Sequence, residues 1–154
     1  MLRLALPALS LALLSSAILL PRPDAAESEE ARWYRGNTHT HTLWSDGDGA
    51  PELVVDLYRE AQYDFLVLTD HNLLSEGERW FPVFQDGDVE KRLSPERVEA
   101  LRGRFGGDSV EVRRTETRQE MRLKTLAELR ERFEEPGEFL LIQGEEVTLS
   151  LIHI

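Results

Sequence analysis

Residues 65–69, which read Phe-Leu-Val-Leu-Thr, form an apolar run that constrains the fold more than any other stretch of the chain. Such a run without alternation is typical of a strand buried on both faces, as in a parallel sheet. Residues 33–42 read as an earlier strand and residues 139–142 as a later one. A helix of about three turns is predicted over residues 51–61. Strand, helix and strand in this order make a βαβ unit of an α/β fold.

The predicted helix is amphipathic, and its apolar stripe is expected to pack into the core while its charged residues lie on the other side. The stripe consists of Leu53, Val54, Leu57, Tyr58 and Ala61, and the charged residues are Glu52, Asp56, Arg59 and Glu60.

Two histidines lie at the end of the first predicted strand. His39 and His41 are two residues apart, which places both side chains on one face of an extended chain. Two neutral imidazoles on one face can hold one metal ion, each with a nitrogen at about 2.0–2.1 Å. Asp46 follows in a turn-forming run, from which its carboxylate can swing back toward the strand end.

Polar residues also follow the other two strands. Asp70 and His71 come directly after the second strand, and Glu146 comes shortly after the third. The carboxyl ends of parallel strands are where α/β proteins place their sites. Each pair alone could be an ordinary surface pair, but the joint pattern favours a metal site. The chain has no Cys, so the ligands must be imidazoles and carboxylates.

The charge balance bears on the partners of the protein, and the N-terminus bears on its location. The formal net charge of −11 argues against a nucleic-acid surface, where clustered Lys and Arg are expected. Residues 1–26 resemble a secretory signal peptide, with Arg3 before an apolar stretch over residues 4–20. We therefore expect an exported protein, periplasmic or secreted, without stable membrane association after cleavage. An uncleaved membrane anchor is the alternative. Residues 27–32 read as a charged lead-in.

Residues 149–154, the last six of the chain, are notable for the codons that can encode them. The six residues can be encoded by a string similar to a transposon-end adapter of sequencing libraries. We predict that they are adapter read-through, and the alternative is a genuine strand. His153 is therefore not counted as a ligand.

Residues 72–137 are predicted to be an irregular insertion. Ser94 is expected to cap a helix that ends near Arg102, and Thr125 with Glu128 forms a capping box for another helix. Residues 110–114 and 120–124 alternate like the strands of a hairpin, whose interleaved charges are read as a solvated face. The aromatic cluster at residues 80–84 either packs this loop down or lines a substrate entrance.

From about Tyr34 to Thr148 the chain resembles the polymerase and histidinol phosphatase (PHP) family of metal-dependent hydrolases. The resemblance implies a distorted (β/α)7 TIM-like barrel, of which residues 33–148 would be the incomplete N-terminal part. It also implies two or three divalent ions, zinc, manganese or iron. The motifs that carry it are His39-Thr40-His41, Ser45-Asp46-Gly47, Thr69-Asp70-His71 and Gly144-Glu145-Glu146-Val147-Thr148.

The resemblance also implies a role for each matched residue. His39 and His41 would bind a first ion, Asp46 and His71 another, and Glu146 would bridge ions. Asp70 would orient its neighbours, and Glu145 would not be a ligand. The family's further His ligands and its late Asp-x-His are missing, so we expect the chain as given to be an inactive fragment of an exported member.

The function that this pattern favours is hydrolysis of a small-molecule phosphoester by metal-bound hydroxide. One alternative is an amidohydrolase-like enzyme that cleaves an amide, an ester or a carbamate. Another is an exported metal-binding or carbohydrate-binding module without catalysis. The fold alone does not decide the substrate.

Overall fold

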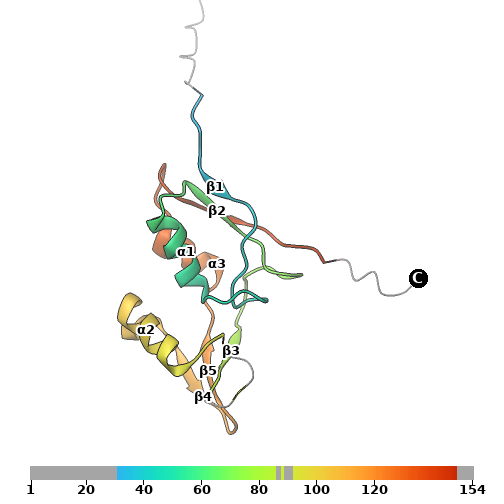
Figure 1. Ribbon diagram of the computed structural model, residues 1–154, viewed down its shortest axis with the longest axis vertical. Coiled ribbons are helices and arrows are strands. Elements are labelled where there is room, and N and C mark those ends of the chain that lie inside the picture. Colours follow the sequence, from blue (N-terminus) through green and yellow to red (C-terminus); the bar gives the residue numbers. More distant parts are fainter. Residues whose placement is uncertain (1–30, 86–87, 89–91, 149–154) are drawn as a thin grey trace, which may run out of the picture. The chain divides into compact units, whose positions relative to one another are not determined.

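The computed structural model describes residues 31–85, 88 and 92–148 (Figure 1). The chain divides into two compact units, residues 1–32 and 33–154, and the description below concerns the second. The predicted signal peptide and the predicted read-through tail with His153 lie outside the described residues. Within the described part of the chain, no helix has the length and hydropathy needed to cross a bilayer.

Three parallel strands form the first sheet, in the order β1 (Gly36–Asn37), β2 (Phe65–Leu68) and β6 (Leu140–Gln143). Gly36 aligns with Phe65, and Leu66 aligns with Leu141. Strands β2 and β6 pair in parallel, as predicted. The first strand is much shorter than the predicted residues 33–42.

Helices α1 (Pro51–Glu60) and α3 (Leu126–Phe133) pack together on one face of this sheet (Figure 1). Proline at the first turn of α1 and the capping box of Thr125 and Glu128 in α3 start the two helices as predicted. The core that they share with the sheet consists of Val55, Leu66, Leu68, Leu126, Leu129, Phe133, Phe139 and Leu141.

The predicted orientation of α1 is wrong in part. Glu52 and Asp56 are buried, whereas Leu57 is 51% exposed. Asp56 tolerates burial because its carboxylate accepts hydrogen bonds from Arg59 at 3.1 Å and Arg104 at 2.7 Å. Ion pairing to a distant helix is not visible in a local hydrophobic pattern, so the periodicity misplaced Asp56 and Leu57, whereas Arg59 and Glu60 are exposed as predicted.

The insertion forms a second, antiparallel sheet in the order β3 (Trp80–Val83), β5 (Gln119–Arg122) and β4 (Val112–Arg114). The β4–β5 hairpin is as predicted. The aromatic cluster at residues 80–84 contributes β3, the remaining strand of this sheet. Helix α2 (Pro95–Phe105) passes through Gly103 and ends at Gly106, whose φ is +96°. A short 3-10 turn, η1 (Gly107–Ser109), follows.

The prediction of an incomplete (β/α)7 TIM-like barrel is wrong. The described residues form a small mixed α/β fold with three α-helices and two separate three-stranded sheets. A barrel needs one continuous parallel sheet that closes on itself, whereas β3, β4 and β5 pair antiparallel in a sheet of their own. The parallel sheet is also covered on one side only, because Leu140 is 52% exposed and Ile142 37% exposed on the other.

A second apolar core ties the insertion to the loop that follows His41. Leu43 and Trp44 of that loop are buried with residues of the antiparallel sheet and α2. The indole N–H of Trp44 donates to the carbonyl of Lys124 at 2.8 Å. The insertion therefore supports this loop directly and is not an independent appendage.

Candidate metal centre

His39 and His41 lie on the same side of the chain, although β1 ends at Asn37. The intervening Thr40 and the following Thr42 point inward and are 6% and 0% exposed. Thr40 holds the chain against β2, since its N–H donates to the Thr69 hydroxyl at 2.9 Å and its carbonyl accepts from the Thr69 N–H at 2.8 Å. The two imidazoles stack with ring centroids 4.9 Å apart. The alternation expected from sequence therefore continues past the end of the regular strand.

Glu146 reaches the imidazoles because the chain beyond β6 stays beside the chain beyond β2. The Glu146 N–H donates to the Asp70 carbonyl at 3.3 Å, and the Glu146 carbonyl accepts from Asn72 at 3.0 Å. Gly144 permits this approach, since a Cβ there would lie 2.6 Å from the Val67 side chain. The two strand ends therefore meet at one edge, as parallel strands do.

The Oε2 atom of Glu146 is the centre of the cluster. It lies 3.0 Å from Nε2 of His39, 2.7 Å from Nε2 of His41 and 3.8 Å from Nδ1 of His71. Both this oxygen and Nε2 of His41 are buried, and neither has a hydrogen bond of acceptable geometry among the described residues. Two imidazole nitrogens and a carboxylate oxygen that converge at these distances fit the donor set of a metal cation.

Two groups of side chains in the described structure have ligand atoms within 4.8 Å of one another. They are His39, His41 and Glu146, and His41, Asp46 and His71. The first group could hold a metal ion. Each sequence-predicted ligand is therefore in one of the two groups, while Glu145 is in neither.

Asp46 is directed at His41 from the loop. Its Oδ1 accepts from Nδ1 of His41 at 2.8 Å, and its Oδ2 lies 3.4 Å from Nε2 of His71. A proton on Nδ1 of His41 leaves the lone pair of Nε2 free to face Glu146 and a cation. The other nitrogen of His71 contacts the hydroxyl of Thr148 at 2.7 Å.

The carboxylates shift the pKa values of the site. Burial lowers the pKa of His41 and is the largest single influence, but the nearby carboxylates of Asp46 and Glu146 together outweigh it, so this pKa is raised above 6.5. The bond to His41 lowers the pKa of Asp46. Without a cation, the site therefore attracts protons to the positions where a metal would bind.

The loop after His41 is tightly wound. The N–H groups of Ser45 and Gly47 both donate to the Thr42 carbonyl, at 3.1 and 3.0 Å. A Cβ at Gly47 would lie 2.5 Å from the carbonyl carbon of His41. Glycine is thus required for Asp46 to turn back onto His41.

Asp70 is 1% exposed and contacts none of the imidazoles. Its carboxylate accepts from the Thr42 N–H at 2.8 Å, the Thr42 hydroxyl at 2.9 Å and the Ser45 hydroxyl at 2.7 Å. It therefore fixes the residues beside His41 and Asp46. Sequence reasoning did not identify Thr42 and Ser45 as its partners, and their hydroxyls beside the two predicted ligands were the available signal.

Comparisons with protein-family models, with curated proteins and with solved structures gave no match to this chain.

Proposed function

We propose that this site belongs to a metal-dependent hydrolase whose substrate is a small-molecule phosphoester. One observation carries the proposal: the buried Oε2 of Glu146 faces Nε2 of His39 at 3.0 Å and Nε2 of His41 at 2.7 Å without a hydrogen bond to either. Such an arrangement is unfavourable unless a proton or a metal cation lies among the three atoms, and the imidazole and carboxylate donors suit a metal cation. The motif resemblance to the PHP family favours a phosphoester over an amide or a carboxylic ester.

The chain's own residues have distinct roles in this proposal. His39, His41 and Glu146 hold one ion, and Asp46 with His71 holds another. Asp46 also fixes the imidazole of His41 through Nδ1, at 2.8 Å. Imidazole and carboxylate donors suit zinc, manganese and iron.

When bound, such ions act as Lewis acids that lower the pKa of coordinated water toward about 7 and neutralise charge on a phosphoryl oxygen. The protein's contribution is to keep the donors on two rigid strand ends and to hold Asp46 in the tight loop at Gly47.

Metal binding is the first test. The purified chain is titrated with Zn²⁺ and Mn²⁺, and Glu146→Gln is compared with Glu145→Gln. Glu145 is the neighbouring carboxylate, is exposed and is outside both ligand groups, so it is a matched control. We expect Glu146→Gln to lower the affinity for these ions by about 100-fold or more. This loss equals or exceeds the largest loss that is usual for residues that only orient a ligand. Equal affinity in the two variants would contradict the proposal.

Hydrolysis is the second test. Nitrophenyl phosphate and nitrophenyl acetate are assayed with added Zn²⁺ or Mn²⁺, in this chain and in any extended protein that the source DNA encodes. In a protein that carries the remaining ligands, the expected result is metal-dependent cleavage of the phosphate, abolished in the double variant His39→Ala/His41→Ala, whereas the chain as given is expected to bind metal without turnover. Preferential ester cleavage would favour the amidohydrolase-like alternative. Metal binding by the extended protein without turnover on either substrate would favour a binding module.

A further inference from the structure

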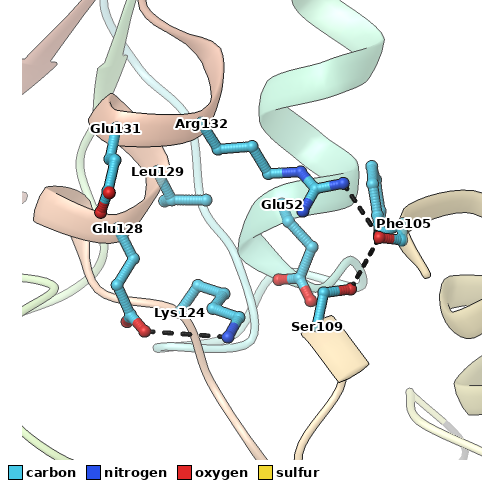
Figure 2. A pocket seen from close by; sticks show the side chains of 8 residues that line it. All are labelled: Glu52, Phe105, Ser109, Lys124, Glu128, Leu129, Glu131 and Arg132. Atoms are coloured by element: carbon cyan, nitrogen blue, oxygen red, sulfur yellow. Dashed lines mark hydrogen bonds and ion pairs between the residues drawn. The ribbon is translucent and has the colours of Figure 1, made fainter. Parts of the chain in front are cut away.

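A cavity of about 230 Å³ lies between the start of α1, the end of α2 and helix α3 (Figure 2). It shares no lining residue with the metal cluster, so a ligand in this cavity would bind independently of the proposed hydrolase site. Its volume is below the range of about 300–1,000 Å³ that suits drug-sized ligands. The lining residues are Glu52, Phe105, Ser109, Lys124, Glu128, Leu129, Glu131 and Arg132.

Glu52 is the unusual member of this lining. The residue is 4% exposed, and its Oε2 has no hydrogen-bond partner among the described residues. Desolvation is the main cause that raises its pKa. An ionised carboxylate oxygen that is buried without a partner is costly, so the ionised form of Glu52 calls for a cationic group that the chain itself does not provide. The terminal torsion of a glutamate is soft, so a small rotation can present either oxygen to the cavity.

Two cations beside Glu52 have bonding capacity to spare. Nζ of Lys124 forms ion pairs with Glu111 and Glu128 at 3.7 Å, but these distances are too long for hydrogen bonds, so its N–H donors can still bind a ligand. Arg132 donates to the carbonyl of Phe105 at 3.0 Å and pairs with no carboxylate in the described part of the chain. In Figure 2 the Arg132 guanidinium lies above the Glu52 side chain, and Lys124, drawn with its ion pair to Glu128, lies below and to the left. The cavity therefore offers a carboxylate oxygen without a partner, an arginine without a carboxylate partner and a lysine held only in long ion pairs.

The Glu128 carboxylate pairs with Lys124 only at 3.7 Å, because its closer partners lie elsewhere. It is held by Arg122 and by the backbone N–H of Thr125, the latter at 2.8 Å. The buried Leu129 lines the cavity between the charged groups and provides an apolar surface.

We propose that this cavity binds a small zwitterion, an α-amino acid with a short side chain. Its ammonium group pairs with Glu52, its carboxylate lies between Lys124 and Arg132, and its side chain contacts Leu129. The zwitterion matches the cavity in charge pattern as well as in size. A simple anion would leave Glu52 unpaired, and a simple cation would leave both basic residues without a ligand partner.

The experiment is a titration of the ¹⁵N-labelled full chain, followed by amide chemical shifts. The probes are glycine, L-alanine and L-serine, and the comparison probes are acetate and methylammonium. We expect the three amino acids to shift the amides of Glu52, Ser109 and Leu129. Acetate and methylammonium, which each satisfy only half of the site, are expected to bind about tenfold more weakly or worse.

Variants separate ligand binding from a structural role of Glu52. Glu52→Gln should weaken amino-acid binding by about tenfold or more, whereas Glu138→Gln, an exposed matched control, should leave it unchanged. Arg132→Gln alters an exposed residue and keeps Glu52 intact, so it tests the carboxylate subsite even if Glu52→Gln does not fold. Unchanged binding in the Arg132 variant, equal binding of acetate or methylammonium, or no amide shifts with any amino acid would each overturn the proposal.

Discussion

Nε2 of His41 and Oε2 of Glu146 lie 2.7 Å apart, both are buried, and they do not form a hydrogen bond of acceptable geometry. Two polar atoms in this relationship need a proton or a metal cation between them, because a buried acceptor without a donor costs about 1–3 kcal/mol. Nε2 of His39 approaches the same oxygen at 3.0 Å. The chain ends beyond β1 and β6 thus direct their imidazoles and carboxylate at a common point, and neighbouring side chains hold them in this position.

The first prediction concerns Asp46, whose carboxylate fixes His41 through Nδ1 at 2.8 Å. Asp46→Asn removes the charge and makes the proton position on His41 ambiguous. We expect the Zn²⁺ affinity to fall by about 10–100-fold, the usual effect of losing a carboxylate that orients a ligating histidine. Asp48→Asn, an exposed carboxylate in the same loop, is the control and should bind as the unaltered protein does. Equal losses in the two variants would contradict the assigned role.

The second prediction concerns Asp70, which accepts three hydrogen bonds from Thr42 and Ser45. Asp70→Asn places an amide NH₂ against groups that are all donors. We expect the free energy of unfolding to fall by about 1–3 kcal/mol and the metal affinity to fall with it. Urea denaturation and zinc titration measure the two effects. If stability falls while zinc affinity is unaltered, Asp70 supports only the fold.

Much of the metal cluster could be predicted from sequence because the relevant spacing is local. His39 and His41 alternate with two inward threonines, and His71 and Glu146 each follow an apolar strand. Parallel pairing then brings distant strand ends to one edge. The contacts of Asp70 with Thr42 and Ser45 were not predictable in the same way, since they join residues 25 and 28 positions apart.

The architecture was less predictable than its elements. The pairing of β3 with β5 depends on contacts about forty residues apart, and β3 contains Pro82, which lowers the strand signal. The burial of Asp56 depends on Arg104, which lies on another helix. Local periodicity identifies helices and strands, but it does not determine which sheet a strand joins or which charged residue is neutralised from a distance.

The third prediction concerns Gly47. A Cβ at this position would lie 2.5 Å from the carbonyl carbon of His41, and backbone atoms cannot move aside cheaply. We expect Gly47→Ala to displace the loop, to cost about 1–3 kcal/mol of stability and to weaken zinc binding. Calorimetric melting with and without zinc measures both effects.

Gly103→Ala is the matched control for that substitution. Gly103 lies inside α2, and a Cβ there would meet no atom within 4 Å. The same change should therefore stabilise the protein by about 0.5–1 kcal/mol, because alanine loses less conformational freedom in a helix. If Gly47→Ala bound zinc as Gly103→Ala does, the loop would not determine the position of Asp46.

The last prediction concerns stability in acid. Arg122 is the main cause that lowers the pKa of Glu128 from 4.5 to about 2. A carboxylate with a depressed folded-state pKa contributes stability that is complete above the unfolded value and is lost as the pH falls from about 4.5 to about 2. Glu128→Gln should therefore destabilise the protein near neutral pH but lose less further stability on acidification. Urea midpoints at about pH 7 and about pH 3 test this, with Glu138→Gln as the exposed control that keeps the original pH dependence. An identical drop in all three proteins would show that the Arg122–Glu128 pair does not contribute to acid sensitivity.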